Sequence, residues 1–152
     1  MRYKIVILSS MLMISGAVKA STVENCVNVK PSDIEELFNK WNASLQTGDP
    51  KKVTDNYLSN AVLVPTISNK IRLTQAERVD YFEHFLAKKP VGKIDSRNIR
   101  IGCNEAIDVG TYTFTFADKT KVSARYTFTY DYTGKEWKIS SHHSSVMPEK
   151  PN

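Results

Sequence analysis

The sequence has few of the residues that build metal centres. Its 152 residues include two cysteines and three histidines, and neither cysteine stands beside a histidine. We therefore expect no metal site, and no other cofactor motif is present. Internal repeats and low-complexity tracts are also absent, which favours a single globular domain.

A strong charge of one sign is missing as well. The formal net charge is +5, but Arg2, Lys4 and Lys19 lie in the first 20 residues, which leaves 18 basic and 16 acidic residues in the remainder. The basic residues are scattered rather than gathered on one element. We expect no nucleic-acid partner, because nucleic-acid binding needs a concentrated basic surface.

One long apolar run is present, at the N-terminus. Arg2 and Lys4 precede an apolar stretch over residues 5–18 that several serines interrupt. This pattern predicts a signal peptide over residues 1–20, cleaved after Ala20, and a mature chain that is periplasmic or secreted and free of the membrane. The alternative is a membrane anchor, but the apolar core is too short to span a bilayer.

An oxidising compartment favours a disulfide between Cys26 and Cys103. Such a bond would tie an N-terminal arm, residues 21–30, to the rest of the fold, with a stabilisation of about 4 kcal/mol in the chain-entropy account. The alternative is a buried, apolar Cys103 and a free Cys26.

The apolar periodicity predicts an α+β domain over residues 31–149, followed by a tail over 150–152. The three- and four-residue steps predict helices over residues 31–47, 50–58 and 75–88, with short strands at 61–66 and 71–73. Thr74 and Glu77 form a capping box before the third helix.

After the third helix the apolar residues alternate instead. The alternation predicts strands over residues 93–103, 106–116, 121–132 and 137–145, joined by short turns. Three helices followed by an antiparallel meander predict helices packed on one face of a curved sheet, with a conical pocket between the layers.

Several segments resemble a known family. They are Leu37-Phe38-Asn39-Lys40-Trp41-Asn42, Thr47-Gly48-Asp49-Pro50, Arg125-Tyr126-Thr127-Phe128, Gly134-Lys135-Glu136-Trp137-Lys138-Ile139 and His142-His143-Ser144-Ser145. The chain is similar to bacterial relatives of the calcium/calmodulin-dependent protein kinase II association domain, within the nuclear transport factor 2-like (SnoaL-like) superfamily. The resemblance implies a cystatin-like cone, a homodimer through the outer face of the sheet and a pocket on its inner face. The chain is not a kinase, because it has neither a Gly-rich loop nor a catalytic-loop motif.

The resemblance also implies that Arg125 points into the pocket. A guanidinium there would need an anion, either a ligand carboxylate or a protein carboxylate such as Asp108 or Asp131. The alternative is an arginine that is exposed or held in a structural ion pair.

The opposite side of the same strand would then form the dimer surface. Alternation places Tyr126, Phe128 and Tyr130 together there, and uncovered aromatic residues favour a protein partner. If the two faces are inverted, these residues form the core instead.

His142 and His143 are neighbours on a strand, so they face opposite sides and cannot share a metal ion. We take His143 as the one in the pocket, as a hydrogen-bond donor or a general base, and Asp108 as a second candidate base. A structural role is the alternative for each. Further ligand candidates are polar-tipped aromatic residues and one arginine, each with a core or rim role as its alternative: Trp41, Tyr57, Tyr81, Tyr112 and Arg72.

Two functions follow from this arrangement. The preferred one is a homodimeric binding and oligomerisation module whose pocket holds a small anionic ligand against Arg125. The alternative is an enzyme of the ketosteroid isomerase or polyketide cyclase type, in which a pocket Asp or His moves a proton. A third hypothesis is a protein partner on the aromatic face.

Overall fold

The computed structural model describes residues 25–66 and 68–148. Its elements are α1 (Pro31–Leu45), α2 (Pro50–Thr54), β1 (Tyr57–Val64), α3 (Gln75–Leu86), β2 (Val91–Ile101), β3 (Glu105–Thr115), β4 (Lys121–Tyr132) and β5 (Trp137–Val146). None of these helices is long and apolar enough to cross a membrane. The expected signal peptide (1–20) and the tail (150–152) lie outside the described residues.

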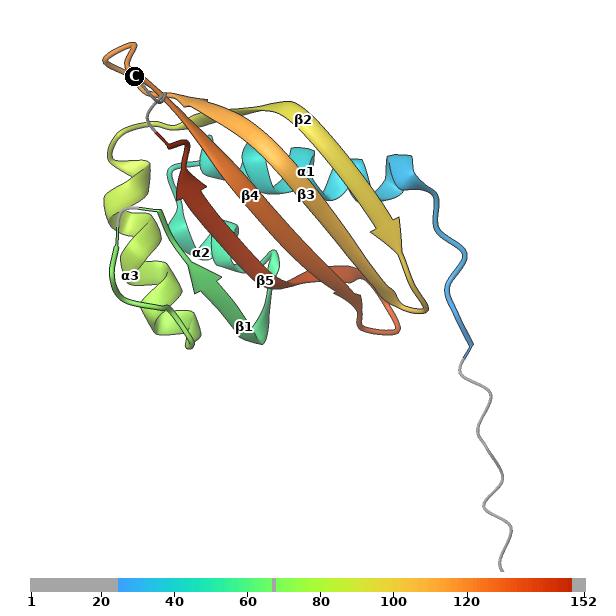
Figure 1. Ribbon diagram of the computed structural model, residues 1–152. Coiled ribbons are helices and arrows are strands. Elements are labelled where there is room, and N and C mark those ends of the chain that lie inside the picture. The colour runs from blue at the N-terminus through green and yellow to red at the C-terminus, as the bar shows by residue number, and fades with distance from the viewer. Residues whose placement is uncertain (1–24, 67, 149–152) are drawn as a thin grey trace, which may run out of the picture.

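The five strands form one sheet in the order β1-β5-β4-β3-β2. Strands β2 to β5 make the predicted antiparallel meander, and β1 pairs with β5 in parallel. All three helices lie on one face of the sheet, which we call the inner face, and the opposite, outer face is left open (Figure 1). The α+β prediction is confirmed.

The first strand differs from its expected limits. β1 begins at Tyr57, so residues 57–58 belong to a strand and not to the second helix. The Asn56 side chain donates to backbone carbonyls of α2, which ends that helix early. The strand expected at 71–73 is reduced to a single bridge between Leu63 and Arg72.

The aromatic residues of β4 are in the core. Tyr126, Phe128 and Tyr130 are at most 2% exposed, and Phe38 of α1 lies 6.4 Å from Tyr126 and 6.2 Å from Phe128 between ring centroids. The prediction that these three residues form a dimer surface is therefore wrong. The helices cover this face, and large apolar rings are buried where a helix can cover them.

Two bulges change the register of the antiparallel part of the sheet. One lies in β2 at Asp95, and close to it Gly110, which pairs with Arg97, has no room for a Cβ beside the Ser96 carbonyl oxygen. The other lies in β5, where Thr129 pairs with Ser141 while the next residue of β4 pairs with Ile139. Ser140 is thus the extra residue, and every side chain after it on β5 changes face.

Cys26 and Cys103 form a disulfide with their Cα atoms 4.7 Å apart, which confirms the predicted pair. The Val27 N–H also donates to Asn104 Oδ1 at 2.9 Å. Together these contacts fix the segment before α1 to the turn between β2 and β3.

Candidate functional site

A cavity of about 130 Å³ lies between the inner face of the sheet and helices α1 and α3. Its walls are mainly aromatic, contributed by Trp41, Phe82, Phe85, Tyr112, Phe114 and Phe116. Among the described residues that line it, only Lys88 carries a formal charge when His142 is neutral. Hydrogen bonds made inside such an apolar enclosure are stronger than the same bonds in water.

Four polar side chains of the cavity are connected by short contacts, and we call them the polar floor: Thr66, Tyr112, His142 and Ser144. The Tyr112 hydroxyl donates to Ser144 Oγ at 2.7 Å, and Ser144 Oγ lies 2.5 Å from Thr66 Oγ1. The Tyr112 oxygen is 3.5 Å from His142 Nε2. The residue paired with Tyr112 on β4 is Ala124, whose small side chain leaves room for the tyrosine to reach β5.

His142 is held as a neutral imidazole. It is 4% exposed, and its ring stacks on Phe128 with the centroids 4.0 Å apart. Burial, with a smaller contribution from His143, lowers the pKa of His142 to about 3. At neutral pH this side chain is therefore a hydrogen-bonding group and a weak base.

Two further aromatic residues hold His142 from behind. The Tyr57 hydroxyl lies 3.0 Å from His142 Nδ1 and accepts a hydrogen bond from Trp41 Nε1 at 3.0 Å. Burial raises the pKa of Tyr57 well above its usual value. The ring orientation of His142 is thus fixed by an interior hydrogen-bond chain.

His143 does not enter the cavity. It is exposed on the outer face, whereas His142 is buried, so the choice of His143 as the pocket histidine is wrong. The bulge at Ser140 is the physical reason, because strict alternation from the buried Ile139 would have turned position 143 inward.

Arg125 also lies outside the cavity. Its side chain is exposed on the outer face, where it lines a shallow groove with His143 and Thr127. The prediction that its guanidinium points into the pocket is wrong, because the aromatic side of β4 faces the helices and Arg125 has the opposite parity.

Asp108 is buried and paired with partners within the protein. It is 0% exposed, its Oδ2 lies 3.0 Å from Arg97 Nη2, and its Oδ1 accepts the Tyr126 hydroxyl at 2.8 Å. Burial raises the pKa of Asp108, and these two partners offset that effect in part. It does not line the cavity, so its proposed role as a pocket base is wrong.

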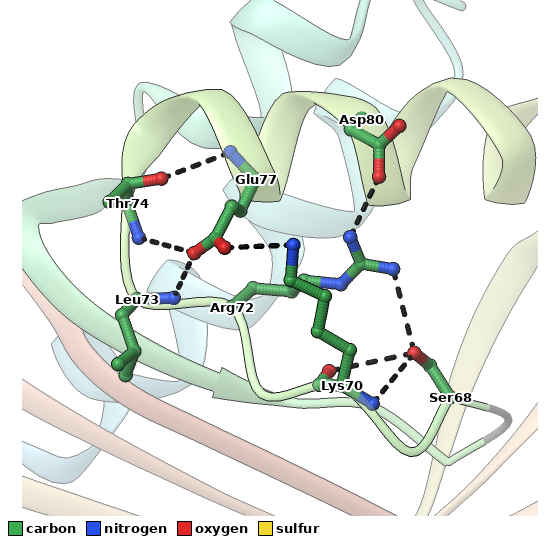
Figure 2. Close-up of polar contacts among 7 residues, drawn as sticks. All are labelled: Ser68, Lys70, Arg72, Leu73, Thr74, Glu77 and Asp80. Carbon is green, nitrogen blue, oxygen red and sulfur yellow. Dashed lines mark hydrogen bonds and ion pairs between the residues drawn. The ribbon is translucent and has the colours of Figure 1, made fainter.

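Arg72 is held beside the cavity rather than inside it. Figure 2 shows its guanidinium between Asp80, at 2.7 Å, and Ser68, at 3.5 Å. The predicted capping box is confirmed in the same view, with the Glu77 N–H donating to Thr74 Oγ1 at 3.2 Å.

The remaining predicted ligand residues are near the cavity. Trp41, Tyr81 and Tyr112 line it, and Tyr57 lies directly behind His142. Burial raises the pKa of Tyr81 to about 12. Their part in ligand binding stays a prediction.

Three polar residues of the cavity were not predicted from the sequence: Thr66, Ser144 and Lys88. Ser144 stood in a quoted motif, and the spacing of two residues from His142 would have placed both on one face once His142 was chosen. Thr66 and Lys88 carry no sequence signal of their own. Within residues 25–66 and 68–148 no group of three His, Cys, Asp or Glu side chains is placed to hold a metal ion.

Comparison with known proteins identifies the family. Residues 30–148 match the model of the calcium/calmodulin dependent protein kinase II association domain. A crystal structure from Xanthomonas campestris, described as such a domain, is 41% identical with a TM-score of 0.76, and the match covers 86% of this chain and 100% of that chain. The search of curated proteins found no match.

Two more distant structures share the fold. A protein with a cystatin-like fold from Caulobacter vibrioides is 15% identical, with a TM-score of 0.66 over 78% of this chain and 89% of that chain. The iota-carbonic anhydrase from a cyanobacterium, complexed with bicarbonate, is 19% identical, with a TM-score of 0.72 over 88% of this chain and 100% of that chain. The helix-covered sheet and the family match agree, and the chain belongs to the calcium/calmodulin dependent protein kinase II association domain family, with a cystatin-like, nuclear transport factor 2-like fold.

Proposed function

We propose that this protein binds bicarbonate in the central cavity and interconverts it with carbon dioxide. The polar floor is the observation that carries the proposal: three hydroxyls and a neutral imidazole lie together in a cavity whose other walls are mainly aromatic and aliphatic. The proposal retains the small anionic ligand that the sequence predicted, but its binding site is the polar floor and not Arg125.

The size of the cavity favours a very small ligand. An engineered apolar cavity of about 150 Å³ holds benzene, and the cavity here is about 130 Å³. Bicarbonate and carbon dioxide fall well within that limit, whereas a steroid or a polyketide exceeds it.

The chemistry of the cavity suits both species. Aromatic walls favour apolar carbon dioxide, and the hydroxyls of Tyr112, Ser144 and Thr66 offer hydrogen bonds to the oxygens of bicarbonate. Lys88 adds a positive charge at the same cavity, which attracts an anion from solution.

The floor would act on the reaction by stabilising charge. In the hydration direction a water oxygen forms a bond to the carbon of carbon dioxide, a carbon–oxygen double bond becomes a single bond, and a water proton is released to solvent. Donors fixed on the floor then stabilise the negative charge that develops on the oxygen atoms. The bicarbonate in the iota-carbonic anhydrase structure supports this choice of ligand within the shared fold.

An enzyme of the ketosteroid isomerase or polyketide cyclase type has less support. Such an enzyme needs a base in the cavity, but Asp108 lies outside it and is paired with Arg97. The pKa of His142, about 3, makes it a poor base at neutral pH.

We also propose that the mature protein is a periplasmic or secreted homodimer. The disulfide supports an oxidising compartment. The outer face supports pairing with a second copy, because Ile107 and Val109 are 41% and 39% exposed there and no helix of the described chain covers them. Cell fractionation and light scattering of the purified protein test these two statements, and a cytoplasmic monomer would contradict both.

Isotope exchange tests the function. Oxygen-18 loss from labelled carbon dioxide measures the interconversion, and calorimetry with sodium bicarbonate measures binding. Ser144→Ala should lower the exchange rate about tenfold or more, because it removes a hydroxyl from the floor. Ser145→Ala is the matched control, since that side chain lies on the outer face and its loss should change neither value. A wild-type protein with neither exchange nor binding would exclude the proposal.

A further inference from the structure

The chain of hydrogen bonds behind His142 has a direction. An indole N–H can only donate a hydrogen bond, so Trp41 Nε1 donates to the Tyr57 oxygen, 3.0 Å away. The Tyr57 proton then has to find another acceptor, and His142 Nδ1 lies 3.0 Å from the same oxygen. Tyr57 is buried, so its hydroxyl cannot donate to bulk water in place of His142.

The two tautomers of neutral His142 differ in how they satisfy this chain. With Nδ1 unprotonated, Tyr57 donates to it and every proton of the chain is used. With Nδ1 protonated, both Trp41 and His142 donate to the Tyr57 oxygen, and the hydroxyl proton of Tyr57 is left buried without an acceptor. An unsatisfied buried donor disfavours that tautomer roughly ten- to a hundredfold.

We propose that Trp41 and Tyr57 are positioning residues that hold His142 as the Nε2–H tautomer, so that the polar floor presents proton donors to an oxygen-bearing anion. Nε2 is on the cavity side of the ring, 3.5 Å from the Tyr112 oxygen. At that distance the hydrogen bond to Tyr112 is weak. The Nε2–H therefore stays available to a ligand.

A second donor comes from the hydroxyls of the floor. Tyr112 donates to Ser144 Oγ, and Ser144 and Thr66 share one hydrogen bond in which either can donate. The two residues have two hydroxyl protons, and whichever residue donates, the hydrogen bond between them uses only one. One hydroxyl proton is therefore left for a ligand in the cavity.

Two available donors on one floor define the ligand class. They match adjacent oxygen acceptors on one small molecule, as in bicarbonate or a short carboxylate, and they reject ammonium and amines, which bring donors of their own. Naming bicarbonate within this class rests on the proposed function, whereas the tautomer itself does not.

Nitrogen-15 NMR of the ligand-free protein measures the tautomer directly, because the two ring nitrogens of a neutral histidine have distinct shifts and only one carries a proton. We expect His142 to show a protonated Nε2 and an unprotonated Nδ1 at neutral pH. A protonated Nδ1 in the wild-type protein would overturn the inference, whatever the protein binds.

Tyr57→Phe tests the positioning role. It removes the donor to Nδ1, so we expect a mixture of tautomers at His142 and about tenfold weaker bicarbonate binding. Tyr130→Phe is the matched control, because it removes a buried hydroxyl that has no hydrogen-bond partner in the described structure. An unchanged tautomer in Tyr57→Phe would remove Tyr57 from this role.

The two proposals fail in different ways. A protonated Nε2 together with no binding of bicarbonate, formate or acetate would support the tautomer and sink the proposed function. Tighter binding of methylammonium than of formate would overturn the donor floor even if the tautomer is as expected.

Discussion

Asp108 and His142 are both buried, titratable and on the inner face of the sheet, yet their surroundings differ. The Asp108 carboxylate has Arg97 and Tyr126 as partners within the protein. His142 is neutral, and it lies beside a cavity. A buried charge needs a partner of opposite charge within the protein, whereas neutral polar groups can stay beside a cavity without one. Burial alone therefore does not distinguish a structural polar cluster from a candidate binding site.

Removing the partner of the charged residue should have the largest effect. Arg97→Met leaves the Asp108 carboxylate buried and unpaired, which should lower the free energy of unfolding by about 3–5 kcal/mol in urea denaturation at neutral pH. Adding Asp108→Asn should recover part of the loss, since a neutral side chain needs no counter-charge. Arg100→Met, at an exposed position of the same strand, is the control. A loss below about 1 kcal/mol for Arg97→Met would mean that the pair is not a structural ion pair.

The pH dependence of stability should separate the two groups by sign. The pKa of His142 is about 3 in the folded protein against 6.5 for an ordinary histidine. The unfolded chain then binds more protons across this window, so the free energy of unfolding should fall as the pH drops from about 6.5 toward about 3, by at most roughly 5 kcal/mol. Asp108 contributes with the opposite sign, because burial raises its pKa and protonation favours the folded state.

Two histidine variants test whether His142 causes this pH dependence of the free energy of unfolding. His142→Gln should flatten the loss of stability between about pH 6.5 and pH 3, and His143→Gln, on the exposed outer face, should leave it intact. Equal slopes in the two variants would show that another group is responsible.

Two tyrosine variants compare the Asp108 cluster with the polar floor, because each variant removes one hydroxyl from one of them. Tyr126→Phe removes a donor to a buried carboxylate and should lower the free energy of unfolding by about 2 kcal/mol without changing bicarbonate affinity. Tyr112→Phe should lower stability by about 1 kcal/mol and weaken bicarbonate binding about tenfold. Denaturation and calorimetry on both variants measure the two values. The reverse pattern would move the candidate site to the Asp108 cluster.

The smallest effect is expected for Arg125→Ala. The side chain is exposed on the outer face, so the free energy of unfolding should change by less than about 0.5 kcal/mol. Bicarbonate affinity should stay at the wild-type value in the same titration. A clear loss of affinity would restore Arg125 as a ligand residue.

The sequence predicted the fold well because the fold depends on periodic burial. The helical steps of Ile34, Phe38, Trp41 and Leu45 gave α1, and all four side chains are buried. Alternation gave the limits of the last four strands to within two residues. The disulfide was predictable from compartment chemistry.

The site was less predictable, because it depends on which face each strand presents. Which alternate set of β4 side chains faces the core depends on which side of the sheet the helices cover. The sequence of β4 by itself does not determine that side. Ser140 and Ser141 are both polar, so the bulge between Ile139 and His142 leaves no break in an apolar pattern. The Arg97–Asp108 pair joins residues on neighbouring strands, a contact that no local motif encodes.

The bulge at Ser140 also makes the site depend on how β5 pairs as well as on side-chain identity. If Ser140 joined the regular ladder instead, strict alternation after Ile139 would turn the side chain of His143 inward in place of His142. Ser144, which accepts a hydrogen bond from Tyr112 on the floor, would turn outward with His142. Deleting Ser140 would keep His142 and Ser144 inward, because alternation over the shortened strand gives them the same parity as Ile139. Relatives of this protein with one residue fewer between Ile139 and the histidine pair should therefore keep the site without a bulge.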